Sequence, residues 1–164
     1  MKTSRLGLRK QSTRLGRFGY QAGRNGTLPT VCEEQIGRVG DFKKLTAWQK
    51  SQELVACIYR LTNSFPVQER YSLSSQMRRA AVSVSANLAE GCGRQGDVEL
   101  RRFVRISLGS LAELECEVLL SASLKFVDPE SCRRICGEIR LVRLMLQRLH
   151  QSLPSNPSRS GPAL

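Results

Sequence analysis

The sequence contains few of the side chains on which enzymes most often depend. Its 164 residues include a single histidine, His150, and aromatic residues make up 5% of the chain. A di-iron site in a helical bundle needs Glu-x-x-His pairs, but the residue three positions before His150 is Gln147. The patterns GxxxxGK[ST] and GxSxG are missing too, and a cysteine nucleophile would need a histidine base nearby. The sequence therefore predicts a protein that is not an enzyme, without catalytic residues or a cofactor.

Long hydrophobic runs and paired cysteine motifs are also absent. No stretch approaches the ~20 apolar residues that span a membrane, and no signal-peptide hydrophobic region is present. None of the cysteines has the CxxC spacing of common zinc sites, although Cys132 and Cys136 lie one helical turn apart and could share a ligand. Reduced core thiols fit better, which predicts a cytoplasmic protein with no metal and no membrane partner. The six cysteines are Cys32, Cys57, Cys92, Cys116, Cys132 and Cys136.

Acidic residues are scarce relative to basic ones. The chain has 26 Lys and Arg against 14 Asp and Glu, a formal net charge of +12. Residues 1–40 hold 8 basic and 2 acidic residues, and residues 41–153 hold 17 and 12. Half of the excess charge therefore lies in the first quarter of the chain. A basic excess favours a polyanionic partner such as nucleic acid, and the alternative is a solvated surface.

The two ends of the chain lack the periodicity of secondary structure. Residues 1–40 are rich in Gly, Ser, Arg and Thr, which predicts a disordered, basic extension. It is either an arm that contacts nucleic acid or a segment upstream of the true start, for example a start at Val39. A transit peptide is a weaker alternative. Residues 154–164 form a Pro/Ser tail that we expect to be disordered.

The remaining chain, 41–153, reads as four amphipathic helices. The helix around residues 74–91 carries a stripe at Leu73, Met77, Ala81, Val84 and Leu88, the period of one buried helix face. The other stripes predict helices over 44–63, 98–124 and 129–153. Short connections between them predict an all-α, up-down-up-down four-helix bundle.

Individual residues mark the predicted helix ends. Ser72, Asp97 and Asp128 are the expected N-caps, with Pro129 at the first helical position. Gly91 and Gly93 are expected to end the second helix, as glycine does after a last turn. Gly109 lies inside the third helix, where glycine costs ~1 kcal/mol against alanine. We therefore expect close helix packing at Gly109 to offset that cost.

Two polar residues, Asn87 and Glu90, lie among small side chains in the second helix. An unsatisfied buried polar group costs about 1–3 kcal/mol. We therefore expect both residues to be buried or interfacial and hydrogen-bonded, Glu90 by an arginine.

Three stretches carry a recognisable pattern: RRAAVSVSANLAEGCGR at 78–94, DFKKLTAWQKSQELV at 41–55 and FVRISLGSLAELE at 103–115. Together they resemble the bacterial four-helix-bundle family named after an open reading frame within intervening sequences of 23S ribosomal RNA. The resemblance covers about 41–153 and implies a pentameric bundle whose biochemical role is not settled. The family often has proline where this chain has Ser85, so the cause of a kink is missing there.

Two helices carry apolar residues beyond the stripe that one bundle can bury. Leaving them in water would expose a contiguous apolar patch, which soluble monomers seldom do. A closed ring of identical subunits would cover the patch, and the number five comes from the resemblance alone. The candidate oligomer interface consists of Cys116, Leu119, Leu120, Leu141, Leu144 and Met145.

Six arginines are expected near the turn between the second and third helices. A ring would repeat them into one positive surface that binds RNA or DNA through phosphates, without sequence specificity. The alternative is that some of them pair with Glu90, Asp97 and Glu99. The fold also resembles accessory proteins of diversity-generating retroelements, which makes a protein-binding subunit of a reverse transcriptase the alternative function. The candidate nucleic-acid-binding residues are Arg78, Arg79, Arg94, Arg101, Arg102 and Arg105.

Overall fold

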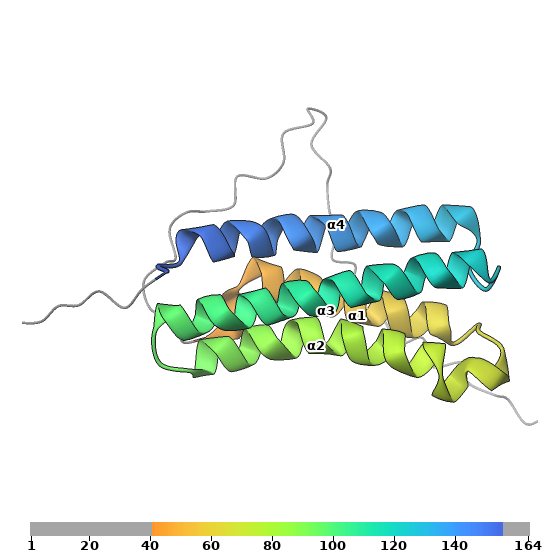
Figure 1. Ribbon diagram of the computed structural model, residues 1–164, viewed down its shortest axis with the longest axis horizontal. Helices are drawn as coiled ribbons and strands as arrows, with labels where there is room; N and C mark the ends of the chain where they lie inside the picture. Colours follow the sequence, from red (N-terminus) through yellow and green to blue (C-terminus); the bar gives the residue numbers. More distant parts are fainter. Residues whose placement is uncertain (1–40, 156–164) are drawn as a thin grey trace, which may run out of the picture. The chain divides into compact units, whose positions relative to one another are not determined.

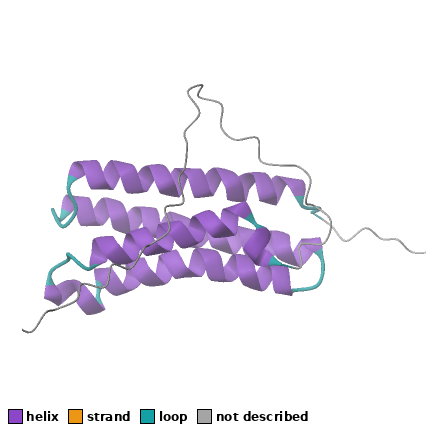
Figure 2. Cartoon of the chain, turned by 180° about the vertical axis from the view of Figure 1, so that it is seen from behind, coloured by secondary structure: helices purple, strands orange, loops and turns teal. Residues whose placement is uncertain are grey.

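The computed structural model describes residues 41–155, and these residues form four long helices. The helices are α1 (Thr46–Thr62), α2 (Leu73–Gly93), α3 (Asp97–Ser123) and α4 (Pro129–Ser152). Short 3-10 helices, η2 (Phe42–Lys44) and η3 (Val67–Tyr71), precede α1 and α2. Figures 1 and 2 show the four helices lying side by side as a bundle. The all-α prediction is confirmed, while the expected disorder of residues 1–40 and 156–164 falls outside the described residues.

Each helix has two neighbours in the bundle. α1 packs against α2 and α4, and α3 packs against the same two helices. The predicted stripe of α2 is entirely buried: Met77, Val84 and Leu88 have no exposed surface. Burying such a side chain contributes about 1.5–3 kcal/mol. Facing them are residues of the other stripes that are equally inaccessible, namely Ile58, Val104, Leu111, Leu114, Val118, Ile135, Ile139 and Leu146.

The N-terminal end of α4 forms as the sequence predicts. The Asp128 carboxylate accepts hydrogen bonds from the backbone N–H groups of Glu130 (3.0 Å) and Ser131 (2.9 Å). These bonds satisfy two of the donors that a helix start leaves free. A hydrogen bond from the Ser131 side chain, followed by these backbone bonds, lowers the pKa of Asp128. Pro129 occupies the first turn, where its missing N–H costs nothing.

The other two predicted N-caps have different outcomes. Ser72 holds the N-cap position of α2 as predicted, although its side chain makes no capping hydrogen bond. Its hydroxyl instead donates to the Glu69 carboxylate, which draws the side chain back toward η3. At α3 the N-cap is Gly96, with a φ of 96° that glycine adopts readily, and Asp97 is the first helical residue.

The predicted end of α2 is confirmed at Gly93, the last helical residue, but it is wrong for Gly91, which lies inside the helix. Gly91 is buried against α3. A Cβ atom there would lie 2.7 Å from the Phe103 Cβ and 3.4 Å from the Leu100 Cα. Gly91 therefore allows α2 and α3 to approach closely. At Gly109, for which we expected that role, an added Cβ atom would meet nothing within 4 Å in the described part of the chain.

Candidate nucleic-acid interface

The six candidate arginines do not gather at one end of the bundle. Arg78 and Arg79 lie in the first two turns of α2, whereas Arg94 follows the last residue of that helix. At about 1.5 Å per residue, the sixteen residues from Arg78 to Arg94 place them roughly 24 Å apart. Arg101, Arg102 and Arg105 belong to the first turns of α3, beside Arg94. The prediction that all six surround the α2–α3 turn is therefore wrong for Arg78 and Arg79.

Arg78 joins α2 to the end of α1. Its Nε donates to the Thr62 hydroxyl (2.7 Å), and a terminal nitrogen donates to the Asn63 side chain (3.0 Å). Its guanidinium also lies over the Tyr59 ring, 5.0 Å from the centroid. Cation–π contacts of this kind add to the two hydrogen bonds. The Arg78 side chain is therefore engaged in contacts within the bundle, whereas Arg79 is exposed.

Arg94 and Arg102 form ion pairs at the α2–α3 turn. Arg94 pairs with Glu90 at 2.6 Å, and Arg102 lies 3.6 Å from Glu99. Both guanidiniums also lie over the Phe103 ring, at 5.7 and 5.9 Å from its centroid. All four charged side chains are exposed enough for water to screen the pairs, so the pairs are weak. The alternative that these arginines have acidic partners holds for two of them.

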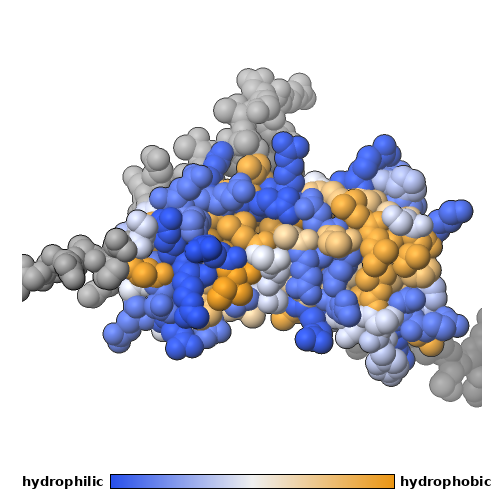
Figure 3. All heavy atoms as spheres, in the orientation of Figure 1, coloured by the Kyte–Doolittle hydropathy of each residue, from blue (hydrophilic) through white to orange (hydrophobic). Residues whose placement is uncertain are grey.

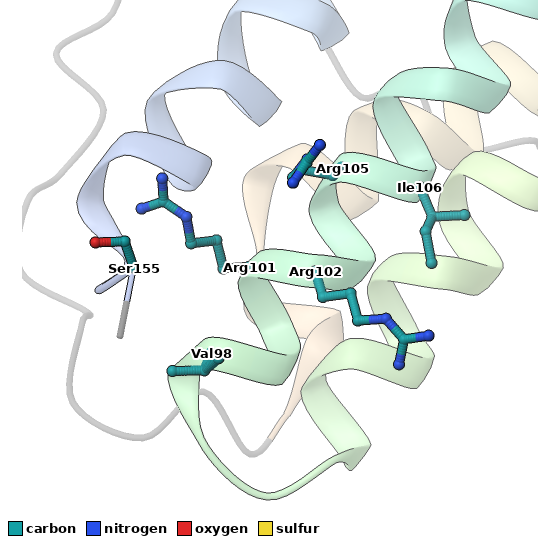
Figure 4. A pocket seen from close by; sticks show the side chains of 6 residues that line it. All are labelled: Val98, Arg101, Arg102, Arg105, Ile106 and Ser155. Carbon is teal, nitrogen blue, oxygen red and sulfur yellow. The ribbon is translucent and has the colours of Figure 1, made fainter. Parts of the chain in front are cut away.

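Arg101 and Arg105 lie one turn apart on α3 and face the end of α4. An Arg101 nitrogen donates to the backbone oxygen of Leu153 at 2.5 Å. Arg105 is exposed and has no ion pair among residues 41–155. Figure 4 shows both side chains extending to the same side, with Arg102 and Ile106 pointing the other way. These residues line an open hollow of about 460 Å³, together with Val98 and Ser155.

His150 is a functional candidate that the sequence pattern did not place. It stands seven residues after Arg143, so both lie on the same face of α4, and Arg143 pairs with Glu115 of α3 at 2.6 Å. The Nε2 atom of His150 is buried without a hydrogen-bond partner among the described residues. Burial lowers the pKa of His150, and the positive charges of Arg101 and Arg105 lower it further.

Asn87 and Glu90 differ in their surroundings. Asn87 is half-buried, and its side-chain nitrogen donates to the Ser83 backbone oxygen (2.7 Å) and hydroxyl (3.0 Å). Glu90 is exposed, and its carboxylate accepts a hydrogen bond from Arg94. Its expected burial within the chain is therefore wrong, although the arginine partner is present. An interfacial position for either residue stays a prediction.

The candidate oligomer interface is largely open to water. Leu119 is 52% exposed, Leu120 is 48% exposed and Leu144 is 38% exposed, and Cys116 is also exposed. Leu141 and Met145 are half-buried, and Met145 packs against the core. Figure 3 shows hydrophobic residues gathered over the end of α3, while the surface over its start is more hydrophilic. The sequence pattern did not single out three further exposed apolar residues, Val82, Ile106 and Leu124.

The cysteines of the described chain are free thiols. Cys92 is buried, and burial followed by the charge of Asp41 raises its pKa to about 11. Cys57 belongs to α1, and its sulfur accepts hydrogen bonds from Arg60 of the same helix at 3.6 Å and from Arg134 of α4 at 3.5 Å. Within residues 41–155 no group of three metal-binding side chains converges. Cys32 lies outside the described residues.

Glu117 is the carboxylate that periodicity did not single out. It is 7% exposed, and its Oε2 atom is buried without a hydrogen-bond partner in the described residues. Burial raises the pKa of Glu117 to about 7, and the negative charge of Glu113 raises it as well. A buried carboxylate without a partner favours its neutral form. Glu117 therefore changes charge near neutral pH.

Replacing Glu117 by Gln is expected to stabilise the protein at about pH 8 and to change little at about pH 4. The folded-state pKa of about 7 lies above the ordinary 4.5, so the folded protein binds this proton more tightly than the unfolded chain does. The stability that Glu117 contributes is present below pH 4.5 and is lost as the pH rises through 7. Urea unfolding should give a difference that grows with pH to about 3 kcal/mol. A difference independent of pH would contradict this assignment, and Glu113→Gln should move the window to lower pH.

Comparison with known proteins places this bundle in a family. The family described as 23S rRNA-intervening sequence protein matches residues 43–148. A crystal structure from Bacteroides thetaiotaomicron, described as a protein with unknown function from the S23 ribosomal protein family, is 20% identical with a TM-score of 0.61. The match covers 65% of this chain and 99% of that one, and at this identity the likeness establishes the fold alone. No curated protein matches the chain. No helix within residues 41–155 is long and apolar enough to cross a membrane.

Proposed function

The chain belongs to the 23S rRNA-intervening sequence protein family, and we propose that it is a non-enzymatic, cytoplasmic scaffold that binds nucleic acid as an oligomeric ring. The observation that carries the proposal is the set of arginines at the start of α3. Arg94, Arg101, Arg102 and Arg105 lie within twelve residues of one another at one end of the bundle. Positive side chains gathered at one end can contact several phosphates of a nucleic-acid backbone.

Within each subunit we propose that successive helices alternate in direction. Two contacts support this arrangement, because each joins the start of one helix to the end of its neighbour. Arg78 near the start of α2 donates to Thr62, the last residue of α1. Arg101 near the start of α3 donates to Leu153, which follows α4. An up-down-up-down bundle accounts for both.

The exposed leucines of α3 and α4 support the ring. Leu119, Leu120 and Leu144 leave apolar surface in water that a second subunit would cover. A closed ring presents the same surface from every subunit and leaves none unpaired. The family resemblance implies five subunits. Because Arg102 and Arg105 lie on the same helix as Leu119 and Leu120, ring closure would repeat the basic end around the assembly.

Contacts to phosphates require charge rather than base recognition. We therefore expect the full-length protein to bind single-stranded RNAs of unrelated sequence with similar affinity. The logarithm of the affinity should fall linearly with the logarithm of salt concentration, at about 0.7 per phosphate contact. Fluorescence anisotropy over a range of salt concentrations measures both properties.

Two double variants distinguish the effect of these arginines from the effect of lowering the net charge. Arg102→Gln with Arg105→Gln should weaken binding and reduce the salt dependence. Arg133→Gln with Arg140→Gln removes the same charge from exposed positions of α4 and should change little. Equal losses from both double variants would contradict a site on α3. Absence of binding to RNA and DNA at low salt would overturn the nucleic-acid function and favour a protein-binding accessory subunit, for example of a reverse transcriptase.

A further inference from the structure

Two arginines, Arg101 and Arg105, line the hollow at the start of α3, and the positive charge of each lowers the pKa of the half-buried His150. Arg101 and Arg105 come from α3, and His150 comes from the last turns of α4. Arg105 has no ion pair in the described part of the chain, and only one Arg101 nitrogen is engaged, by the Leu153 backbone oxygen. Unused donors therefore remain on two adjacent guanidiniums, which is the arrangement that binds tetrahedral oxyanions.

We propose that Arg101, Arg105 and His150 form a phosphate-binding subsite that takes one backbone phosphate of a nucleic-acid strand and takes up a proton as it does so. This proposal rests on the proposed function, since the phosphate belongs to the strand that the ring binds. The two arginines supply the donors and the positive charge. His150 stands three residues before Leu153, whose backbone oxygen Arg101 contacts, and its protonation responds to the charge of the bound phosphate.

The proton uptake follows from the charges around His150. The charges that lower its pKa come from α3, Arg101 first and then Arg105. The ion pair further along the same α3–α4 face, Arg143 with Glu115, is neutral overall. A bound phosphate offsets the two arginines, so the pKa of His150 rises toward its ordinary value. Binding therefore becomes tighter as the pH falls through the range between the free and bound pKa values, and is independent of His150 above that range.

The sequence makes the proton uptake directly measurable, because His150 is the only histidine. The full-length protein without a histidine tag would be titrated with pH while the His150 ring proton is followed by NMR. The titration would be run in sulfate, and again in chloride at equal ionic strength. Sulfate is a tetrahedral dianion whose charge is constant in this range, so it stands for the phosphate. We expect sulfate to raise the pKa of His150 by about one unit.

Two arginine variants provide the matched comparison in the same titration. Arg105→Gln should raise the pKa of His150 in chloride and remove most of the response to sulfate. Arg133→Gln removes the same charge from an exposed position near the start of α4, roughly 25 Å along the helix from His150, and should leave both values unchanged. No response of His150 to sulfate in the wild type would overturn the subsite. An equal response in the Arg105→Gln protein would also overturn it.

Measurements of oligonucleotide binding distinguish a failure of the phosphate subsite from a failure of the proposed nucleic-acid function. For a single-stranded RNA, wild-type affinity should increase several-fold from about pH 8 to about pH 5.5, and His150→Gln should lose that dependence. RNA binding without any response of His150 would leave the proposed function intact and overturn the subsite. A sulfate response without RNA binding would support an oxyanion site and overturn the nucleic-acid function.

Discussion

A protein carrying Leu120→Glu and Leu144→Glu is expected to sediment as a folded monomer, whereas the wild type is expected to sediment as a ring. Leu120 is 48% exposed and Leu144 is 38% exposed in the single chain. Neither side chain fills the core, so a glutamate at either position can reach water and the helices should remain. In a subunit interface the same two carboxylates would lose water without gaining partners, which is strongly unfavourable.

The control for this experiment is Val67→Glu. Val67 is 80% exposed and lies in η3, outside the apolar patch on α3 and α4. It adds a charge to an exposed apolar position without touching the candidate interface, so the ring should persist. Wild-type protein that sediments as a monomer at micromolar concentration would reject the ring. A double variant that still forms the oligomer would show that other residues make the interface.

Nucleic-acid binding by the monomeric variant tests whether assembly and binding are coupled. One subunit offers only its own arginines, whereas a ring offers the same set from every subunit. The monomer should therefore bind RNA more weakly and with a shallower dependence on salt. Circular dichroism of both proteins confirms that the comparison is between folded states.

The helices were predictable from sequence because burial repeats along the chain. Met77, Val104 and Ile139 each belong to a series of apolar residues at helical spacing along their own helix, and all three are fully buried. The cap at Asp128 was predictable for a related reason, since its side chain acts within three residues of its own position. Local periodicity and local hydrogen bonds leave a direct record in the sequence.

The placement of the arginines shows what periodicity does not record. Arg78 and Arg94 belong to one contiguous motif, yet they mark opposite ends of a helix. The contact that fixes Arg78 comes from Thr62, on another helix. Likewise, Glu117 is a charged residue that we did not expect to be buried, and its burial depends on how the helices beside α3 pack against it. Both facts depend on which helix face meets which neighbour.

Gly91 and Gly109 also show that the sequence alone does not reveal which helix face meets a neighbour, because each has the role that we did not expect. Glycine at the end of an apolar stripe favours a helix end, and glycine within a stripe favours close packing. Gly91 nevertheless lies inside α2, close against α3, whereas a Cβ atom added at Gly109 would meet nothing within 4 Å in the described chain. Only the neighbouring helix distinguishes the two roles.

Gly91→Ala is therefore expected to lower the free energy of unfolding by about 1–3 kcal/mol. The added methyl would lie 2.7 Å from the Phe103 Cβ, an atom fixed to the backbone that cannot rotate away. α2 and α3 would have to separate, and Leu100 on the same face would lose packing. Gly109→Ala should instead stabilise the chain by up to about 1 kcal/mol, since alanine favours a helix and the space is open.

Urea unfolding of both variants beside the wild type measures this contrast. A neutral Gly91→Ala would contradict the close approach of α2 to α3 at this position. A Gly109→Ala protein that is destabilised, and that loses its oligomeric state at the same time, would mean that a second subunit covers Gly109. Combining Gly109→Ala with the Leu120→Glu, Leu144→Glu background separates these effects. In monomers only the bundle remains, and the alanine should be stabilising there.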